Sequence, residues 1–144
     1  MLVQTGVKYV IVCEGLNDFV IPGLIGRPAE DVTAEQVIQG HRQIIDRAHA
    51  LGLRIYGATS NPFVGSRFFS AAAAAKRQAV NHWIRTSNAY DAVIDFDKVL
   101  RDPSHPTRLL PAYDSGDHVH PNDIGYKTMA DAIDLSLFRD DDED

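Results

Sequence analysis

The sequence predicts an α/β fold, a parallel sheet with helices on both of its faces. Segments with strand and helix character alternate along the 144 residues. The first strand segment, residues 7–13, is almost continuously apolar and rich in β-branched residues, as in strands that are covered on both faces. The segments between the strands are also long enough to connect parallel neighbours.

The first strand leads into residues that disfavour regular structure. Prolines and glycines interrupt residues 19–31, which predicts a long loop leaving the sheet. Cys13 closes the apolar run and is expected to be buried and unreactive. A single cysteine excludes an internal disulfide framework and a cysteine-rich zinc site.

A long amphipathic helix is predicted over residues 33–51. Thr33 and Gln36 have the spacing of a capping box, and Gly52 is a natural C-terminal stop. We expect His41, on the apolar face, to pack in the core rather than bind a ligand. The apolar face is formed by Val37, Ile38, His41, Ile44, Ile45, Ala48 and Leu51.

The alternation continues in the second half of the chain. Residues 53–58 predict a second strand that ends in a turn-forming segment. Residues 70–86 predict a helix, because five alanines favour it and Val80, Trp83 and Ile84 supply a packing face. Residues 92–96 predict a third strand.

A surface segment and a final helix complete the domain. Residues 102–116 contain three prolines and are expected to be irregular. The last helix is expected to begin near Asn122 or Asp123. Its predicted inner stripe is Ile124, Met129, Ala132, Ile133 and Leu137. We interpret residues 1–138 as one domain and residues 139–144 as a solvated acidic tail.

Composition narrows the class of protein. A net charge of −6 disfavours binding to a phosphate backbone, which requires clustered Lys and Arg, so no nucleic-acid partner is expected. No apolar run approaches the length of a bilayer span, and the first residues lack the pattern of a secretory signal. We therefore expect a globular domain without a transmembrane segment.

Asp117 and His120 are candidates for acid–base chemistry. Their spacing lets one tight loop place the carboxylate on Nδ1 of the imidazole and leave Nε2 free as a base. Pro121 and the start of the final helix would hold this loop rigid. The alternative is a helix-capping loop whose histidine is an ordinary surface residue.

Asn17 is a candidate donor to a developing negative charge. It follows the first strand in the segment Gly15-Leu16-Asn17-Asp18, where Gly15 removes side-chain bulk at the turn. The alternative is an ordinary turn built from Gly, Asn and Asp. Both motifs, in this order and at the ends of the predicted elements, favour the chemical interpretation.

Together these motifs resemble the third and fifth conserved blocks of the GDSL or SGNH hydrolases. The resemblance covers nearly the whole chain, including Gly57-Ala58-Thr59 and residues 77–81. It implies a three-layer, flavodoxin-like fold and a carboxylic ester hydrolase, an esterase or lipase, that acts on a small-molecule ester by serine-type acyl transfer without a cofactor. It also implies that Asn17 is an oxyanion-hole donor, that Asp117 orients the base and that His120 is the base.

The nucleophile block of that family is missing. The chain contains neither the Gly-Asp-Ser signature nor the second block with its oxyanion-hole glycine. We therefore expect the truncated C-terminal part of a domain, whose sheet lacks its first strands. Ser60 and Ser66 follow the second strand and lie at the correct end of the sheet, but we interpret both as structural.

Two further interpretations concern metals and partners. Asp114, Asp117, His118 and His120 concentrate potential metal ligands, but no separate ligand cluster accompanies them, so no bound metal is predicted. An unpaired sheet edge at residues 9–13 would invite a second copy, so self-association is expected. The chain is then either a hydrolase segment or a noncatalytic remnant that acts only through association.

Overall fold

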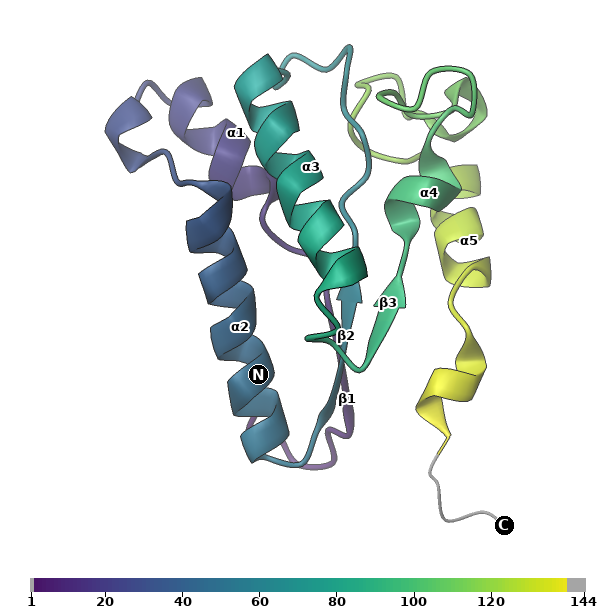
Figure 1. The fold of residues 1–144 in the computed structure, drawn as a ribbon. Helices are drawn as coiled ribbons and strands as arrows, with labels where there is room; N and C mark the ends of the chain where they lie inside the picture. Colours follow the sequence, from purple (N-terminus) through teal and green to yellow (C-terminus); the bar gives the residue numbers. More distant parts are fainter. Residues whose placement is uncertain (1, 140–144) are drawn as a thin grey trace.

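A three-stranded parallel sheet forms the middle layer of the fold (Figure 1). The structure, a computed structural model, describes residues 2–139. Strands β1 (Tyr9–Val12), β2 (Arg54–Ala58) and β3 (Ala92–Ile94) lie side by side in chain order. The predicted α/β class with a parallel sheet is confirmed. Apart from Arg139, the predicted acidic tail lies outside the described residues.

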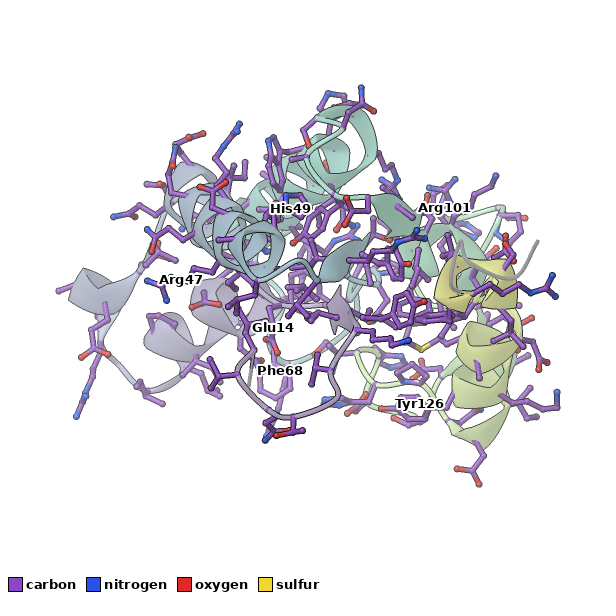
Figure 2. The ribbon with its side chains drawn as sticks, turned by 90° about the horizontal axis from the view of Figure 1, so that it is seen from below. Glu14, Arg47, His49, Phe68, Arg101 and Tyr126 are labelled. Carbon is purple, nitrogen blue, oxygen red and sulfur yellow. The ribbon has the colours of Figure 1, made fainter. Side chains whose placement is uncertain are left out.

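Alternate residues of the strands enter two separate cores. On one face of the sheet, Val10, Val12 and Ile55 pack in the core beneath α2 (Ala34–Ala50) and α3 (Ala71–Thr86). These two helices lie side by side on that face (Figures 1 and 2). The alternation follows from the two-residue period of a β-strand.

The other face of the sheet is covered only in part. Tyr56, on β2, belongs to a second core that includes residues of α5 (Asp123–Asp131) and η3 (Leu135–Phe138), so helices flank both faces. On this face of β1, however, Ile11 is 41% exposed. The second helical layer therefore reaches Tyr9 at the start of β1, which contacts the ring of Phe138, but leaves Ile11 partly uncovered.

The predicted loop over residues 19–31 is wrong in part. Residues Leu16–Leu24 form α1, and Pro28–Glu30 form a short 3-10 helix, η1. Pro22 lies in the last turn of α1, where its missing N–H removes a single intrahelical donor. Phe19 is buried in the first core, so tertiary packing stabilises a helix that the local composition disfavours.

Several predicted boundaries are confirmed within a residue or two. The capping box of α2 is present, because Thr33 Oγ1 accepts from the Gln36 backbone N–H at 3.1 Å and Gln36 Oε1 accepts from the Thr33 N–H at 2.8 Å. Ser70 caps α3 in the same way through the N–H of Ala73. Residues 102–116 are irregular, as predicted, apart from the 3-10 helix η2 (Pro111–Tyr113).

The predicted third strand and last helix are both too long. Asp95 accepts a hydrogen bond from the Lys98 N–H and so caps α4 (Phe96–Leu100), which turns the chain out of the sheet after Ile94. α5 ends at Asp131 rather than near residue 137. The predicted inner stripe is wrong at two positions, since Ile124 and Ala132 are exposed, whereas its other members pack against the second core: Met129, Ile133 and Leu137.

The substitution Gly57→Ala is expected to lower the free energy of unfolding by about 1–3 kcal/mol, as overpacking does. An added Cβ would lie 2.4 Å from the buried ring of Tyr90. Urea denaturation measures the change. The matched control is Gly40→Ala within α2, where the Cβ meets nothing within 4 Å; it is expected to stabilise the protein by about 0.5–1 kcal/mol. Unchanged stability of Gly57→Ala would contradict this prediction.

Candidate functional site

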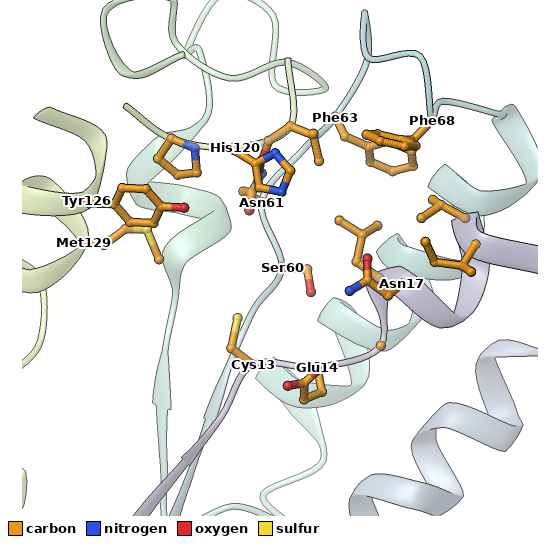
Figure 3. A pocket seen from close by; sticks show the side chains of 16 residues that line it. Cys13, Glu14, Asn17, Ser60, Asn61, Phe63, Phe68, His120, Tyr126 and Met129 are labelled. Atoms are coloured by element: carbon orange, nitrogen blue, oxygen red, sulfur yellow. Dashed lines mark hydrogen bonds between the residues drawn. The ribbon is translucent and has the colours of Figure 1, made fainter. Parts of the chain in front are cut away.

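One pocket of about 420 Å³ lies beyond the carboxyl ends of β1 and β2 (Figure 3). The start of α1, the loop after β2, the loop before α5 and α5 itself line it. Both Asn17 and His120 are among the lining residues, and Figure 3 shows them on different sides of the pocket, with Ser60 between them in this view. The structure thus brings together two residues that are 103 positions apart in the sequence (120 − 17).

Asp117 and His120 form a direct pair. Oδ2 of Asp117 lies 2.6 Å from Nδ1 of His120, so Nε2 is the ring nitrogen left to face a substrate. The other carboxylate oxygen of Asp117 accepts from the backbone N–H groups of Val119 and His120 at 3.0 and 2.8 Å, and from the hydroxyl of Ser115 at 3.0 Å. The carboxylate is therefore fixed from several directions.

These hydrogen bonds control the ionisation of Asp117. Loss of hydration opposes the charged form, but the hydrogen bonds from the His120 ring, from two backbone N–H groups and from Ser115 outweigh it. Together they hold the pKa of the Asp117 carboxyl well below its ordinary value of 3.8. Asp117 is consequently a carboxylate throughout the neutral range and can stabilise a positive charge on His120.

The loop that carries this pair is closed by its own backbone and by Asn122. The Ser115 N–H donates to the His120 carbonyl at 3.1 Å, and Asp114 and Pro121 form an isolated antiparallel β-bridge. Asn122 Oδ1 accepts from the Gly125 N–H at 3.0 Å and caps α5. The loop is thus a helix-capping loop, as the alternative interpretation expected, while the role of His120 stays a prediction.

A second aspartate–histidine pair lies on the same loop. Asp114 Oδ2 is 2.5 Å from His118 Nδ1. His118 has a positive φ of 63° and packs against Gly65, outside the lining of the pocket that Asn17 borders. Each aspartate thus contacts its own histidine. Within residues 2–139, no group of three or more His, Cys, Asp or Glu side chains is arranged to hold a metal ion.

Asn17 lies in the first turn of α1, which begins at the pocket. The N-cap of α1 is Gly15, which has a φ of 114°. No side chain caps the N–H groups at this positive end of the helix, which lies at the pocket. An added Cβ on Gly15 would lie 2.8 Å from Val37 Cγ1. Glycine therefore lets this turn rest directly on α2.

The loop after β2 is held by polar side chains of α3. Ser60 is clamped by Asn81, which accepts from its N–H at 2.9 Å and donates to its carbonyl at 2.8 Å. Arg77 Nη1 also donates to the Ser60 carbonyl at 2.6 Å. One residue later, Asn61 Nδ2 donates to the Val119 carbonyl at 2.8 Å. This chain of contacts connects α3 to the residue that precedes His120.

Sequence reasoning did not assign roles to these supporting residues. Arg77 and Asn81 stand four positions apart in α3, on one face of the helix, and both are buried. A buried arginine and a buried asparagine at helical spacing are the signal that could have identified them, because such groups require polar partners. Asn61 offered no comparable signal.

Ser60 and Cys13, with a hydroxyl and a thiol, both line the pocket. Among the described residues, neither makes a hydrogen bond with His120. The expectation that Cys13 is buried is wrong: it is exposed, because β1 ends at Val12 and the face of the sheet below it is uncovered. Ser66, by contrast, is buried and accepts from the Phe68 N–H, which agrees with a structural role.

The chain belongs to the GDSL-like lipase/acylhydrolase family, which matches residues 2–128. A search of the curated proteins found no significant match. Three solved structures share the fold: a protein of Desulfitobacterium hafniense assigned to the G-D-S-L family of lipolytic proteins (TM-score 0.66, 19% identity), a GDSL-like lipase of Bacteroides thetaiotaomicron (0.70, 18%) and a protein of Bacteroides fragilis assigned as an acylhydrolase (0.72, 18%).

The matches cover 87%, 91% and 91% of this chain, respectively. The chain itself spans only 62%, 62% and 61% of the three solved proteins. At such low identity these structures establish the three-layer architecture alone. In the part of the chain that the structure describes, no helix combines the length and the apolar character needed to cross a membrane.

The carboxyl of Asp117 is expected to titrate below 3.8 and to shift upward in His120→Ala. The pKa of Asp117 is lower in the folded than in the unfolded protein. Ionised Asp117 therefore adds fully to the free energy of unfolding above about pH 4, and this contribution is lost as the pH falls through the folded pKa. A carboxyl carbon NMR titration of both proteins measures the midpoints. The same midpoint in wild type and His120→Ala would show that the ring does not stabilise the carboxylate.

Proposed function

We propose that this domain is a carboxylic ester hydrolase that acts by serine-type acyl transfer. The supporting observation is that Asn17 and His120 border one pocket, with the His120 ring held by Asp117 from behind its Nδ1. Membership of the GDSL-like lipase/acylhydrolase family supports a hydrolase function independently of this geometry. An attacking hydroxyl requires an oriented imidazole that takes its proton and an amide that donates to the oxyanion.

The proposed reaction assigns one role to each residue. A serine hydroxyl attacks the ester carbonyl carbon while its proton passes to Nε2 of His120, and Asp117 stabilises the resulting imidazolium. Asn17 donates to the oxyanion of the tetrahedral intermediate. The intermediate collapses when the alcohol leaves with the proton from His120. Water, with His120 taking its proton, then attacks the acyl-enzyme; the bond between serine and the acyl group breaks, the carboxylic acid is released and the serine regains its proton from His120.

The nucleophile in this scheme belongs to the complete domain. The chain spans about 62% of the solved relatives and contains no Gly-Asp-Ser signature. For the chain alone to be active, either Ser60 or a water activated by His120 would have to take over the attack. Ser60 borders the pocket, but no hydrogen bond joins it to His120.

The walls of the pocket suggest how an ester would lie. The side of the pocket formed by α1 and by the loop after β2 is apolar. Its side chains are Leu16, Val20, Phe63 and Phe68. We assign the acyl part of a small-molecule ester to this side, because burial of its methylene groups contributes about 0.8 kcal/mol each. The carbonyl would then lie toward Asn17.

The substitution His120→Asn is expected to reduce hydrolysis of a short p-nitrophenyl ester by at least about 100-fold, because general acid–base catalysis contributes that much. Asparagine offers a side-chain amide to Asp117 in place of Nδ1–H but has no counterpart of Nε2. Labelling by a fluorophosphonate probe, followed by mass spectrometry, identifies the attacking residue in the same samples.

The matched control is His118→Asn, on the same loop. His118 has its own aspartate, and although it borders a neighbouring pocket together with His120, it does not line the pocket that Asn17 borders. Asparagine also tolerates its positive φ of 63°. We expect His118→Asn to keep wild-type turnover. Equal hydrolysis by wild type and His120→Asn would instead favour a noncatalytic protein.

A noncatalytic role would rest on self-association through β1. In the described sheet β1 has β2 as its one neighbouring strand, and Ile11 on it is 41% exposed. An unpaired edge with an apolar side chain is a template for strand pairing. We therefore propose that two copies associate through β1.

The substitution Ile11→Lys is expected to shift the protein toward monomer in analytical ultracentrifugation, because a charge on an edge strand opposes pairing. Val93→Lys is the matched control, since Val93 on β3 is 40% exposed, almost the same as Ile11. The association model requires that only Ile11→Lys dissociates the copies. A monomeric wild type at micromolar concentration would rule it out.

A further inference from the structure

His41 is a buried imidazole that the proposed reaction does not use. It lies on α2 and is 3% exposed. Its Nδ1 is 2.5 Å from the hydroxyl of Tyr90, and its ring packs edge-on against Tyr90 and Trp83 at 6.0 Å between centroids. The prediction that His41 packs in the core is confirmed, but its polar atoms require a separate explanation.

The second ring nitrogen of His41 faces the turn before Asn17. Nε2 is buried and has no partner with ordinary hydrogen-bond geometry among the described residues. An added Cβ on Gly15 would lie 3.9 Å from it. Burial lowers the pKa of His41, and an interaction with the backbone of Glu14 and with the carboxylates of Glu14 and Asp18 opposes that effect. Nε2 therefore lies close beneath the Glu14–Gly15 backbone.

Tyr90 determines which ring nitrogen carries the proton. Burial raises the pKa of the Tyr90 hydroxyl well above its usual range, so this hydroxyl keeps its proton. Since the pKa of His41 is lowered, its ring is neutral near pH 7, and Nδ1 accepts a hydrogen bond from the Tyr90 hydroxyl. The remaining ring hydrogen is then on Nε2. Gly57 fixes the donor, because its missing side chain leaves room for the Tyr90 ring.

We propose that His41, anchored by Tyr90, is a positioning residue that directs Nε2–H at the Glu14 carbonyl and thereby fixes the turn that carries Asn17. The buried Nε2–H has no other acceptor among the described residues, and a hydrogen bond to the Glu14 carbonyl would satisfy it. The consequence for catalysis rests on the function proposed for Asn17, whereas the consequence for the turn does not.

The test compares three variants by amide hydrogen exchange. His41→Phe removes both ring nitrogens, Tyr90→Phe removes only the anchoring hydroxyl, and His41→Gln retains an N–H near the position of Nε2. We expect His41→Phe and Tyr90→Phe to accelerate exchange at Phe19 and Val20, the first amides of α1 with acceptors inside the helix, about tenfold relative to amides of β2, since the turn that begins α1 opens more often. His41→Gln is expected to stay close to wild type.

A matched control separates this effect from a general loss of stability. Ile45→Val removes a buried methylene one turn further along α2 and touches none of the polar contacts. It should change exchange at Phe19 and Val20 no more than elsewhere. If His41→Phe does not fold, Tyr90→Phe and His41→Gln still decide the question.

Three outcomes would overturn the proposal: unchanged exchange in Tyr90→Phe, equal acceleration in His41→Gln and His41→Phe, or equal acceleration in Ile45→Val. Kinetics add a readout wherever turnover is measurable. A positioning role lowers kcat about tenfold in Tyr90→Phe and leaves KM unchanged. Accelerated exchange combined with hydrolysis that does not depend on His120 would refute the proposed esterase function while leaving the positioning role of His41 supported.

Discussion

The buried ion pair between Arg77 and Asp97 is the constraint on which the site depends. One nitrogen of the Arg77 guanidinium donates both to Asp97 at 2.7 Å and to the Ser60 carbonyl at 2.6 Å. Both charged side chains are almost fully buried. Asp97 also pairs with Arg85, whereas Asp97 is the one charged partner of Arg77 among the described residues, so removal of Asp97 would leave a buried, uncompensated charge and cost about 3–5 kcal/mol. The segments after β2 and β3 are therefore held to α3 as one unit, and Asn61 extends that unit to Val119.

The two sides of the pocket are held by different physical means. Asn17 belongs to a helix that depends on apolar packing, since Gly15 rests on Val37 and Phe19 enters the first core. His120 lies on an exposed loop whose shape comes from hydrogen bonds to Asp117 and from backbone closure. Core substitutions should thus disturb the amide side first, and changes of pH or salt the imidazole side.

The sequence predicted those features that have a strong local cause. The capping box of Thr33 defined the start of α2, and hydrophobic periodicity located α3. α1 was missed because its stability comes from the burial of Phe19 rather than from its composition, and Cys13 was misplaced because an apolar run does not reveal which face remains uncovered. The short spacing from Asp117 to His120 was sufficient to predict their contact. The clamp on Ser60 joins residues 17 and 21 positions apart, which no local pattern encodes.

The loop between Asp114 and Pro121 has a consequence for how such a protein can diverge. Its internal hydrogen bonds join residues no more than seven positions apart, and it ends in the cap of α5. Asn61 links it to the unit on α3 through the Val119 carbonyl. A segment whose shape comes largely from its own hydrogen bonds tolerates exchange of other distant residues while this link is kept, so selection can reshape the surrounding walls without first rebuilding the imidazole geometry. The same autonomy makes this octapeptide, together with its capping asparagine, a transferable unit for grafting onto the helix of another scaffold.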